Sequence, residues 1–161
     1  LLVKYRKGST LFWKETLACN GYVGKNGIDK TREGDMRTPT GDWGILSAFG
    51  IKNDPGTKLP YRHLTDDVYC CGDKVAYNRM ISINEVPHKC TGEHMVKYAP
   101  AYNYGFFLDY NKECEFGKGS AIFFHCCGSS KSTAGCISVD EPNMVKILQS
   151  ISINARIIVG R

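Results

Sequence analysis

Apolar and polar residues alternate along this chain in short segments, which predicts a protein built mainly from β-strands. Most apolar segments end at a glycine, proline or asparagine, as strands bounded by turns do. The segments expected to form strands are residues 10–18, 43–49, 80–83, 104–110, 120–124 and 155–159. Turns are expected between them at residues 24–27, 39–41, 53–56 and 117–119. Many short strands with few helices indicate a mainly β sandwich or barrel with helical caps.

One segment has the periodicity of an α-helix. Its apolar positions follow the i, i+3, i+4, i+7 spacing of one helix face: Met144, Ile147, Leu148 and Ile151. Asp140 is suited to cap the N-terminus, and Pro142 is suited to the first turn. We therefore predict a helix that begins after Asp140 and packs its apolar face on a sheet. A second, shorter helix is expected at residues 93–98.

Length and composition place the chain among ordinary globular domains. No internal repeat, low-complexity segment or linker divides residues 1–161, so one domain is expected. Hydrophobic residues make up 42% and charged residues 23%, which excludes collagen-like, disordered and coiled-coil proteins. The longest purely apolar runs, at residues 121–124 and 157–159, are far too short to span a membrane. Residues 1–10 lack an apolar core, so they do not resemble a signal peptide.

The positive charge is mild, because 21 basic and 16 acidic residues give a net charge of +5. Lysine and arginine occur in runs no longer than two, which argues against nucleic-acid binding. A solvated basic surface accounts for this balance. The alternative is attraction to an anionic partner, such as a bacterial wall or an acidic peptide.

Residues 124–139 combine the residue types of a cysteine nucleophile and its base. His125 ends an apolar segment, a polar Gly/Ser loop follows, and Gly135-Cys136 begin the next apolar segment. A thiol nucleophile needs a base within hydrogen-bond reach, and a loop of this length can bring His125 and Cys136 together. Gly135 allows a tight turn, so its N–H and that of Cys136 could face a developing oxyanion. The alternative is a buried structural cysteine beside a histidine.

Six blocks of sequence support the first interpretation by their order. The blocks are Gly24-Lys25-Asn26-Gly27 with Arg32-Glu33-Gly34-Asp35 and Thr38-Pro39-Thr40-Gly41, then Leu59-Pro60-Tyr61-Arg62, Tyr77-Asn78, Gly92-Glu93-His94-Met95, residues 117–125, and Thr133-Ala134-Gly135-Cys136. Together they resemble the L,D-transpeptidase catalytic domain family of the YkuD type, in its branch with a Thr-Ala-Gly-Cys motif. The resemblance covers about residues 20 to 150.

This resemblance implies an enzyme of bacterial peptidoglycan with a mainly β, sandwich- or barrel-like fold and a few short helices. Enzymes of the family use no metal or organic cofactor. Their cysteine attacks the carbonyl after the L-centre of diaminopimelate in a tetrapeptide stem and expels the terminal D-alanine. An amine of another stem then gives a 3→3 crosslink, or water completes a carboxypeptidase reaction.

The resemblance also assigns roles to residues of this chain. Cys136 is expected to be the nucleophile and His125 the general base, with the backbone carbonyl of Cys126 orienting the histidine where a carboxylate would otherwise stand. The main family has a histidine at the position of Ala134, an arginine at the position of Ser138, and a longer loop. The Thr-Ala-Gly-Cys branch shares these departures, which leave open whether an amine or water accepts the acyl group.

Further residues are candidates for substrate binding: Ser132, Thr133, Tyr77 and Asn78. The first two could instead cap their own loop, and the Tyr-Asn pair could simply form a turn. Arg32, Glu33 and Asp35 could bind a stem carboxylate or amine, although a polar turn next to Thr38-Pro39 is the expectation.

Eight cysteines are present, and assigning Cys136 as the nucleophile leaves seven whose pairing the sequence does not define. The seven are Cys19, Cys70, Cys71, Cys90, Cys114, Cys126 and Cys127. Adjacent cysteines fit disulfide geometry poorly, so the two vicinal pairs are not expected to bridge internally. His88 with Cys90, or His125 with the cysteines after it, could suggest zinc, but no C-x-x-C pair is present and no metal is expected.

Two hypotheses from other classes accompany the enzyme: a wall-binding module without activity, and a redox or zinc protein built around Cys126-Cys127. The presence of both His125 and Cys136 favours the enzyme. We expect a monomer that acts on peptidoglycan stem peptides outside the membrane, in the cell wall or periplasm.

Overall fold

A six-stranded sheet lies at the centre of the computed structural model, which describes residues 2–5, 14–86 and 88–160. Its strands, in spatial order, are β3 (Gly21–Tyr22), β12 (Ile137–Val139), β11 (Phe123–Cys126), β10 (Gly105–Leu108), β5 (Ile45–Gly50) and β6 (Tyr61–His63). The pairs β11–β12 and β5–β6 are parallel, and the other neighbouring pairs are antiparallel.

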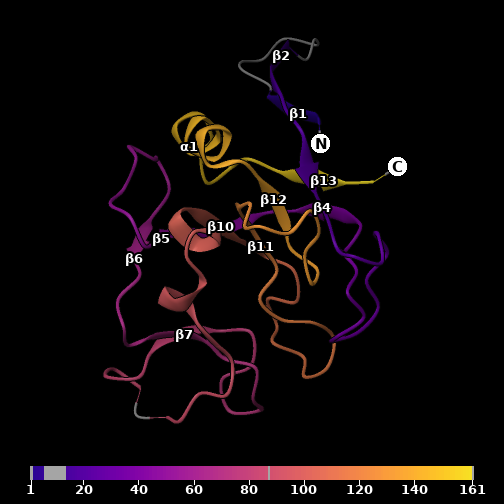
Figure 1. Ribbon diagram of the computed structural model, residues 1–161. Coiled ribbons are helices and arrows are strands. Elements are labelled where there is room, and N and C mark those ends of the chain that lie inside the picture. The colour runs from indigo at the N-terminus through magenta and orange to yellow at the C-terminus, as the bar shows by residue number, and fades with distance from the viewer. Residues whose placement is uncertain (1, 6–13, 87, 161) are drawn as a thin grey trace.

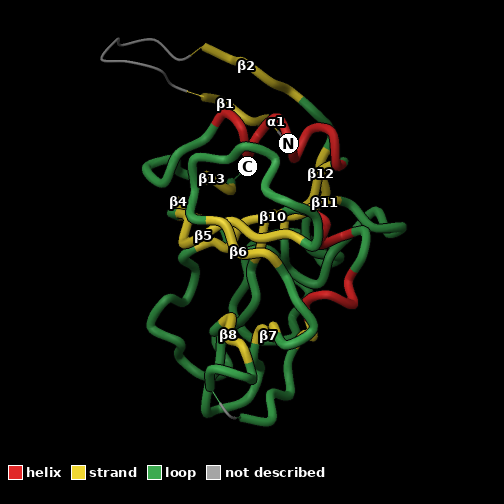
Figure 2. The backbone as a smooth tube through the Cα atoms, turned by 90° about the vertical axis from the view of Figure 1, so that its left-hand side faces the viewer, coloured by secondary structure: helices red, strands yellow, loops and turns green. Residues whose placement is uncertain are grey.

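Smaller elements surround this sheet. They are the hairpin of β1 (Leu2–Tyr5) and β2 (Lys14–Ala18), the pair β4 (Gly41–Trp43) and β13 (Ile157–Val159), the sheet of β8 (Met80–Ser82), β7 (Val68–Cys70) and β9 (Glu93–His94), the 3₁₀ helices η1 (Met95–Tyr98) and η2 (Ala101–Asn103), and helix α1 (Glu141–Ser150). Helix α1 and the β1–β2 hairpin lie on one side of the central sheet, and β7 lies on the other (Figures 1 and 2).

Helix α1 confirms the prediction made from its periodicity. The Asp140 carboxylate caps the helix, because its Oδ1 accepts a hydrogen bond from the Asn143 N–H at 2.9 Å. Met144, Ile147 and Leu148 are buried against the sheet. Burial of a side chain of this size contributes about 1.5–3 kcal/mol, so packing on the sheet holds this ten-residue helix in place.

The central sheet separates two hydrophobic cores. Phe124 and Ile137 belong to the core beneath α1, whereas Phe123 belongs to the core on the opposite face, together with residues of β7 and η1. All four residues of β11 are buried. Because successive side chains of a strand point to opposite faces, each face of β11 faces a packed interior.

The structure confirms a mainly β fold with several sheets, as a sandwich has, and the described strands do not close into a barrel. Expected strands at residues 80–83, 104–110 and 155–159 are present as the shorter β8, β10 and β13. The expected strand at residues 10–18 is β2 from residue 14 onward, and residues 10–13 lie outside the described residues.

Three expected elements differ from the structure. The strand expected at 43–49 is interrupted at Gly44, whose N–H donates to Asp109 Oδ1 at 2.7 Å, so β4 and β5 join different sheets. The strand expected at 120–124 begins only at Phe123, because Ala121 has a left-handed backbone with φ +53°. The helix expected at 93–98 is a two-residue strand followed by η1.

Candidate active site

Strands β11 and β12 bring His125 and Cys136 to the same face of the central sheet. In their parallel register His125 lies opposite Ser138, two residues after Cys136. Cys136 packs in the same core as Phe123, and the His125 ring packs edge-on against the Tyr102 ring of that core at 5.3 Å. Both His125 and Cys136 are 8% exposed. The sheet register therefore gathers the two residues that the sequence analysis singled out.

Two threonine hydroxyls hold the backbone of Cys136. Thr133 Oγ1 donates to the Cys136 carbonyl at 2.6 Å, and Thr38 Oγ1 donates to the same oxygen at 3.2 Å. The Thr38 hydroxyl in turn accepts from the Gly24 N–H at 2.8 Å, and Thr38 is fully buried. The loop before Cys136 is thus tied to residues about one hundred positions earlier in the chain.

Gly135 has a backbone conformation that favours glycine. Its φ is +151°, and a Cβ at this position would lie 3.0 Å from the Arg37 carbonyl oxygen and 3.6 Å from Lys30 Nζ. The Gly135 N–H donates to Thr133 Oγ1 at 3.1 Å. The chain therefore reaches Cys136 through a turn that passes close to the segment around residues 30–37.

The Cys136 thiol is held by the backbone of β11 and of the residues just before it. Cys136 Sγ donates to the Ala121 carbonyl at 3.1 Å and accepts from the Phe123 N–H at 3.3 Å. The left-handed backbone of Ala121, unusual for a residue other than glycine, occurs at the residue whose carbonyl accepts the thiol. Asn78 Oδ1 accepts from the Ala121 N–H at 2.9 Å and so fixes this turn.

The imidazole of His125 is held through one nitrogen. His125 Nδ1 lies 2.7 Å from the Cys126 carbonyl oxygen. Because a carbonyl only accepts, Nδ1 carries the hydrogen and Nε2 is the unprotonated nitrogen. Burial lowers the pKa of His125, although the carbonyls of Cys126 and Ala101 act in the opposite direction. A neutral imidazole whose Nε2 carries no hydrogen is a competent proton acceptor.

The Cys136 thiol is protonated at neutral pH. The pKa of Cys136 is raised to about 12, by burial first and then by the negative charge of Glu93, while the Phe123 N–H and Lys30 act in the opposite direction. Within the described part of the chain, no hydrogen bond joins Cys136 Sγ to His125. The resting pair is therefore a neutral thiol bonded to a carbonyl, beside a neutral histidine.

A buried acid and a phenol lie beside this pair. Tyr102 O–H donates to Glu93 Oε2, and the ring of Tyr102 contacts His125. Burial raises the pKa of Glu93 and, well above its ordinary value, that of Tyr102. Lys30 is also enclosed, with its side chain 2% exposed and its Nζ 2.9 Å from Asp35 Oδ1. The site thus holds a carboxyl group and an ion pair in addition to the thiol and imidazole.

The predicted substrate-binding residues have different surroundings. Tyr77 O–H donates to Glu33 Oε2 and accepts from the Gly119 N–H, and burial raises its pKa to about 12. Asn78 is buried, and its Nδ2 donates to the carbonyls of Tyr110 and Asn111. These bonds, with the one to Ala121, use both ends of the Asn78 amide. Asn78 therefore positions the backbone next to Cys136.

The loop residues Ser132 and Thr133 also differ from each other. Ser132 is half-buried, and its hydroxyl lies 3.4 Å from that of Ser130. Thr133 is engaged with the backbone of Gly135 and Cys136, and its own backbone bonds to that of residues 23 and 25. Binding of substrate by either residue stays a prediction.

The segment with Arg32, Glu33 and Asp35 forms the polar turn that was expected. The Asp35 carboxylate accepts from the N–H groups of Thr31, Arg32 and Arg37 and from Lys30. Burial acts to raise the pKa of Asp35, but these hydrogen bonds hold that pKa well below its ordinary value. Glu33 accepts from the Ser120 hydroxyl at 2.7 Å as well as from Tyr77.

Four residues of the site lie outside the residues assigned to it from the sequence: Thr38, Lys30, Tyr102 and Glu93. Thr38 and Glu93 fall inside sequence blocks that resemble the family, so these blocks were the available signal. Lys30 and Tyr102 carry no local signal, because their proximity to Cys136 and His125 arises only when distant segments pack together.

The cysteines divide into one disulfide and a set of free thiols. Cys71 and Cys90, which are separated by 19 positions in the sequence, form a disulfide. The free thiols are Cys19, Cys70, Cys114, Cys126, Cys127 and Cys136. Among the described residues, one group has the proximity required of metal ligands, and it includes neither His125 nor Cys136.

A thiol, a histidine oriented by a carbonyl and a glycine turn are groups that cysteine acyltransferases and hydrolases use. The family model of the L,D-transpeptidase catalytic domain (YkuD) matches residues 1–159, and the chain belongs to this family. The domain is therefore an L,D-transpeptidase-type catalytic domain, and its family acts on peptidoglycan peptides. No curated protein sequence matches the chain.

Proposed function

We propose that the domain is a peptidoglycan L,D-transpeptidase in which Cys136 is the nucleophile. Its Sγ attacks the carbonyl of diaminopimelate in a tetrapeptide stem, the bond to the terminal D-alanine breaks, and a thioester forms. The observation that carries this proposal is the parallel register of β11 and β12: His125 in β11 lies opposite Ser138, and Cys136 directly precedes β12 and packs in the core of Tyr102, whose ring contacts His125.

The proton path follows from how the two side chains are held. The Cys136 proton is bonded to the Ala121 carbonyl, so the thiol must turn away from that carbonyl before Nε2 of His125 takes the proton. The Cys126 carbonyl keeps Nδ1 protonated and stabilises the imidazolium that forms. His125 then returns the proton to the amine of the departing D-alanine.

The developing oxyanion is proposed to be bound by the backbone N–H groups of Gly135 and Cys136. The Gly135 N–H donates to Thr133 Oγ1 in the resting site. Substrate must therefore replace this acceptor, and the Thr133 hydroxyl stays bonded to the Cys136 carbonyl. Until substrate binds, the Thr133 hydroxyl is therefore the acceptor for the Gly135 N–H that is proposed to bind the oxyanion.

An amine from a second stem is proposed to resolve the thioester and give a 3→3 crosslink. The alternative, hydrolysis by water, would make the domain an L,D-carboxypeptidase. Both use the same acyl-enzyme. We also propose action in the cell wall or periplasm, because peptidoglycan is the family's substrate. Among the described residues, no helix is long and apolar enough to cross a membrane.

The test is incubation with disaccharide-tetrapeptides, followed by mass spectrometry of both products and intact protein. We expect an acyl-enzyme whose added mass equals the substrate minus D-alanine, together with crosslinked dimers. If tripeptides form without dimers, the domain has the alternative activity of a carboxypeptidase and does not act as a transpeptidase. Cys136→Ser should remove the acyl-enzyme and the products, whereas Cys114→Ser should leave both unchanged. Absence of acyl-enzyme and products with the unaltered protein would refute both activities.

A further inference from the structure

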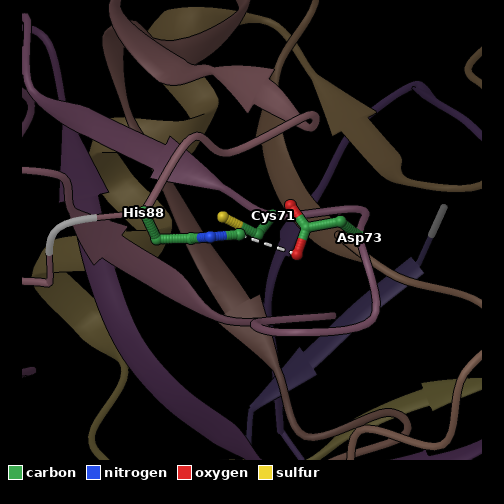
Figure 3. Close-up of side chains that lie close together, drawn as sticks. All are labelled: Cys71, Asp73 and His88. Carbon is green, nitrogen blue, oxygen red and sulfur yellow. Dashed lines mark hydrogen bonds and ion pairs between the residues drawn. The ribbon is translucent and has the colours of Figure 1, made fainter.

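A second group of reactive side chains lies in the loop that connects β8 to β9 and in the residues after β7. One ligand atom from each of Cys71, Asp73 and His88 lies within 4.8 Å of the other two. Figure 3 shows the three side chains pointing toward one another, with a hydrogen bond between His88 and Asp73. None of them takes part in the proposed acyl transfer.

Cys90 adds a fourth possible ligand to this group. It is bonded to Cys71 through the disulfide, and the Cα atoms of the two residues are 5.4 Å apart. Breaking this bond would leave two neighbouring thiols, of which that of Cys71 already lies within 4.8 Å of ligand atoms of His88 and Asp73. The order along the chain is then Cys-x-Asp and, after a loop, His-x-Cys.

These four groups match the ligand preferences of zinc. Zn²⁺ takes thiolate, imidazole and carboxylate ligands at about 2.0–2.3 Å in a tetrahedron, which places the ligand atoms about 3–4 Å apart. The separations among Cys71, Asp73 and His88 require only a small contraction to reach that range, and the Cys90 thiol, which lies outside this group of three, would have to turn toward it once the disulfide opens. His88 Nε2 and Asp73 Oδ1, 2.8 Å apart, would separate slightly around the ion.

Backbone N–H groups already orient the side chain of Asp73. Asp73 Oδ2 accepts from the Thr91 N–H at 3.1 Å, and Oδ1 accepts from the N–H groups of Val75 and Ala76 at 3.1 and 3.2 Å. Such hydrogen bonds to a ligating carboxylate are the usual support around a metal ion.

We propose that the reduced form of the Cys71–Cys90 pair binds one Zn²⁺ together with His88 and Asp73. The disulfide and the zinc ion are thus alternative crosslinks of the same loop. A dithiol reductant opens the disulfide by thiol–disulfide exchange, gives two cysteine thiols and is itself oxidised to a disulfide. Zn²⁺ then replaces the two thiol protons, which are released to solvent.

Exchange of the disulfide for zinc at this place would affect the pairing of β7 with β9. Cys70 and Glu93 are paired across β7 and β9, one residue from Cys71 and three from Cys90. Either crosslink therefore fixes the β7–β9 pairing, and with it the strand that carries Glu93 to Tyr102. Reduction without zinc would release this pairing, whereas zinc would restore it.

The experiment is a Co²⁺ titration of the Cys136→Ser protein, reduced with dithiothreitol and freed of it under nitrogen. Serine at position 136 removes the thiol of the proposed active site from the measurement. We expect one Co²⁺ per chain, with thiolate-to-cobalt charge-transfer bands and the strong visible bands of a tetrahedral site, displaced by one equivalent of Zn²⁺. The oxidised protein should show none of these bands.

Ligand substitutions assign the site. His88→Ala and Cys90→Ser should each weaken binding by more than about a hundredfold, beyond the loss typical of outer-shell partners. His63→Ala and Cys114→Ser are matched controls at an exposed histidine and a free cysteine, and they should bind as the parent does. If either of these ligand variants fails to fold, Asp73→Asn is used in its place. This substitution keeps an oxygen acceptor for Thr91, and it should weaken the cobalt bands.

The proposal is overturned if the reduced protein shows no tetrahedral spectrum. It is also overturned if the spectrum survives in Cys90→Ser and His88→Ala, because the metal would then bind other thiols. Equal binding by the oxidised protein would refute the role of the two cysteines. None of these outcomes depends on acyl transfer, so the site stands or falls separately from the proposed function.

Discussion

The domain contains two places where histidine and cysteine meet, and they are held in different ways. At the first, His125 lies in β11 and Cys136 directly before the adjacent strand β12, and a neutral carbonyl orients the histidine. At the second, His88 faces the carboxylate of Asp73, next to a disulfide in a loop. The same residue types therefore have different partners and different rigidity.

This difference separates the proposed proton acceptor from the proposed metal ligand. A histidine beside a carbonyl, buried and with a lowered pKa, stays neutral and can take a proton from a neighbouring thiol. A histidine beside a half-buried carboxylate and a disulfide sulfur matches part of a donor set for a divalent cation. Surroundings, rather than residue type or spacing, decide which chemistry each pair can support.

Removal of the base is expected to have the largest effect. His125→Ala should lower acyl-enzyme formation by about 10²–10⁴-fold, the range for a general base. It should also slow alkylation of Cys136 by iodoacetamide at neutral pH. His63→Ala, at an exposed histidine, should change neither rate. Equal alkylation of Cys136 in His125→Ala and in the unaltered protein would refute the pairing.

Removal of the disulfide should affect the second region far more than the first. The chain-entropy estimate for a loop of this size is about 3 kcal/mol, so Cys71→Ala with Cys90→Ala should lower the free energy of unfolding by about that amount. Urea denaturation measures it. Substrate turnover at temperatures well below the transition should stay largely intact, and complete loss of activity in a folded variant would show that the loop contributes directly to the first site.

Loss of the Thr38 hydroxyl tests how the first region is assembled. Thr38→Val keeps the shape but leaves the Gly24 N–H without its acceptor and removes one donor to the Cys136 carbonyl. An unpaired buried group costs about 1–3 kcal/mol, which should appear in the free energy of unfolding. Thr40→Val, where the hydroxyl bonds at the surface, is the matched control and should cost less. Equal losses would contradict the proposed support of Cys136.

The smallest effect concerns the acidity of Cys136. Because its pKa is raised to about 12, the alkylation rate of Cys136 should rise steadily between pH 7 and pH 10 instead of levelling near its ordinary value of 9.0. Glu93→Gln removes a negative charge that raises this pKa and should increase the rate a few-fold at pH 8. A plateau below pH 9 would show that the thiol is more acidic than its surroundings imply.

The same shift has a consequence for stability. Between pH 9 and pH 12 the unfolded chain loses the Cys136 proton while the folded chain retains it, so this group lowers the free energy of unfolding as pH rises. The unaltered protein should therefore lose more stability than Cys136→Ser over this interval.

Local patterns in the sequence predicted part of the fold. Helix α1 is defined by its own apolar spacing and by the cap at Asp140, and both are local features. The interruption at Gly44 was not predictable, because it depends on a bond to Asp109, sixty-five positions away. The left-handed turn at Ala121 likewise depends on the Asn78 amide and has no signal in the adjacent residues.

The candidate site was predictable where residues are adjacent in sequence or belong to a recognisable block. His125 and Cys136 could be chosen because one short loop joins two strands. The neighbours of these residues, Tyr102 and Lys30, come from separate segments that meet only in the packed structure. The Cys71–Cys90 bond could not be chosen among seven cysteines, since spacing alone does not define connectivity.

The bond from Thr38 to the Cys136 carbonyl, which joins residues 98 positions apart, links activity to the order of folding. While the chain is unfolded, its eight thiols compete equally for disulfide partners. Closing the sheet buries Cys136 with its proton on a backbone carbonyl, which removes the most important thiol from that competition. Because non-local contacts of this kind are slow to form, Cys136 stays available for non-native disulfides until the sheet closes.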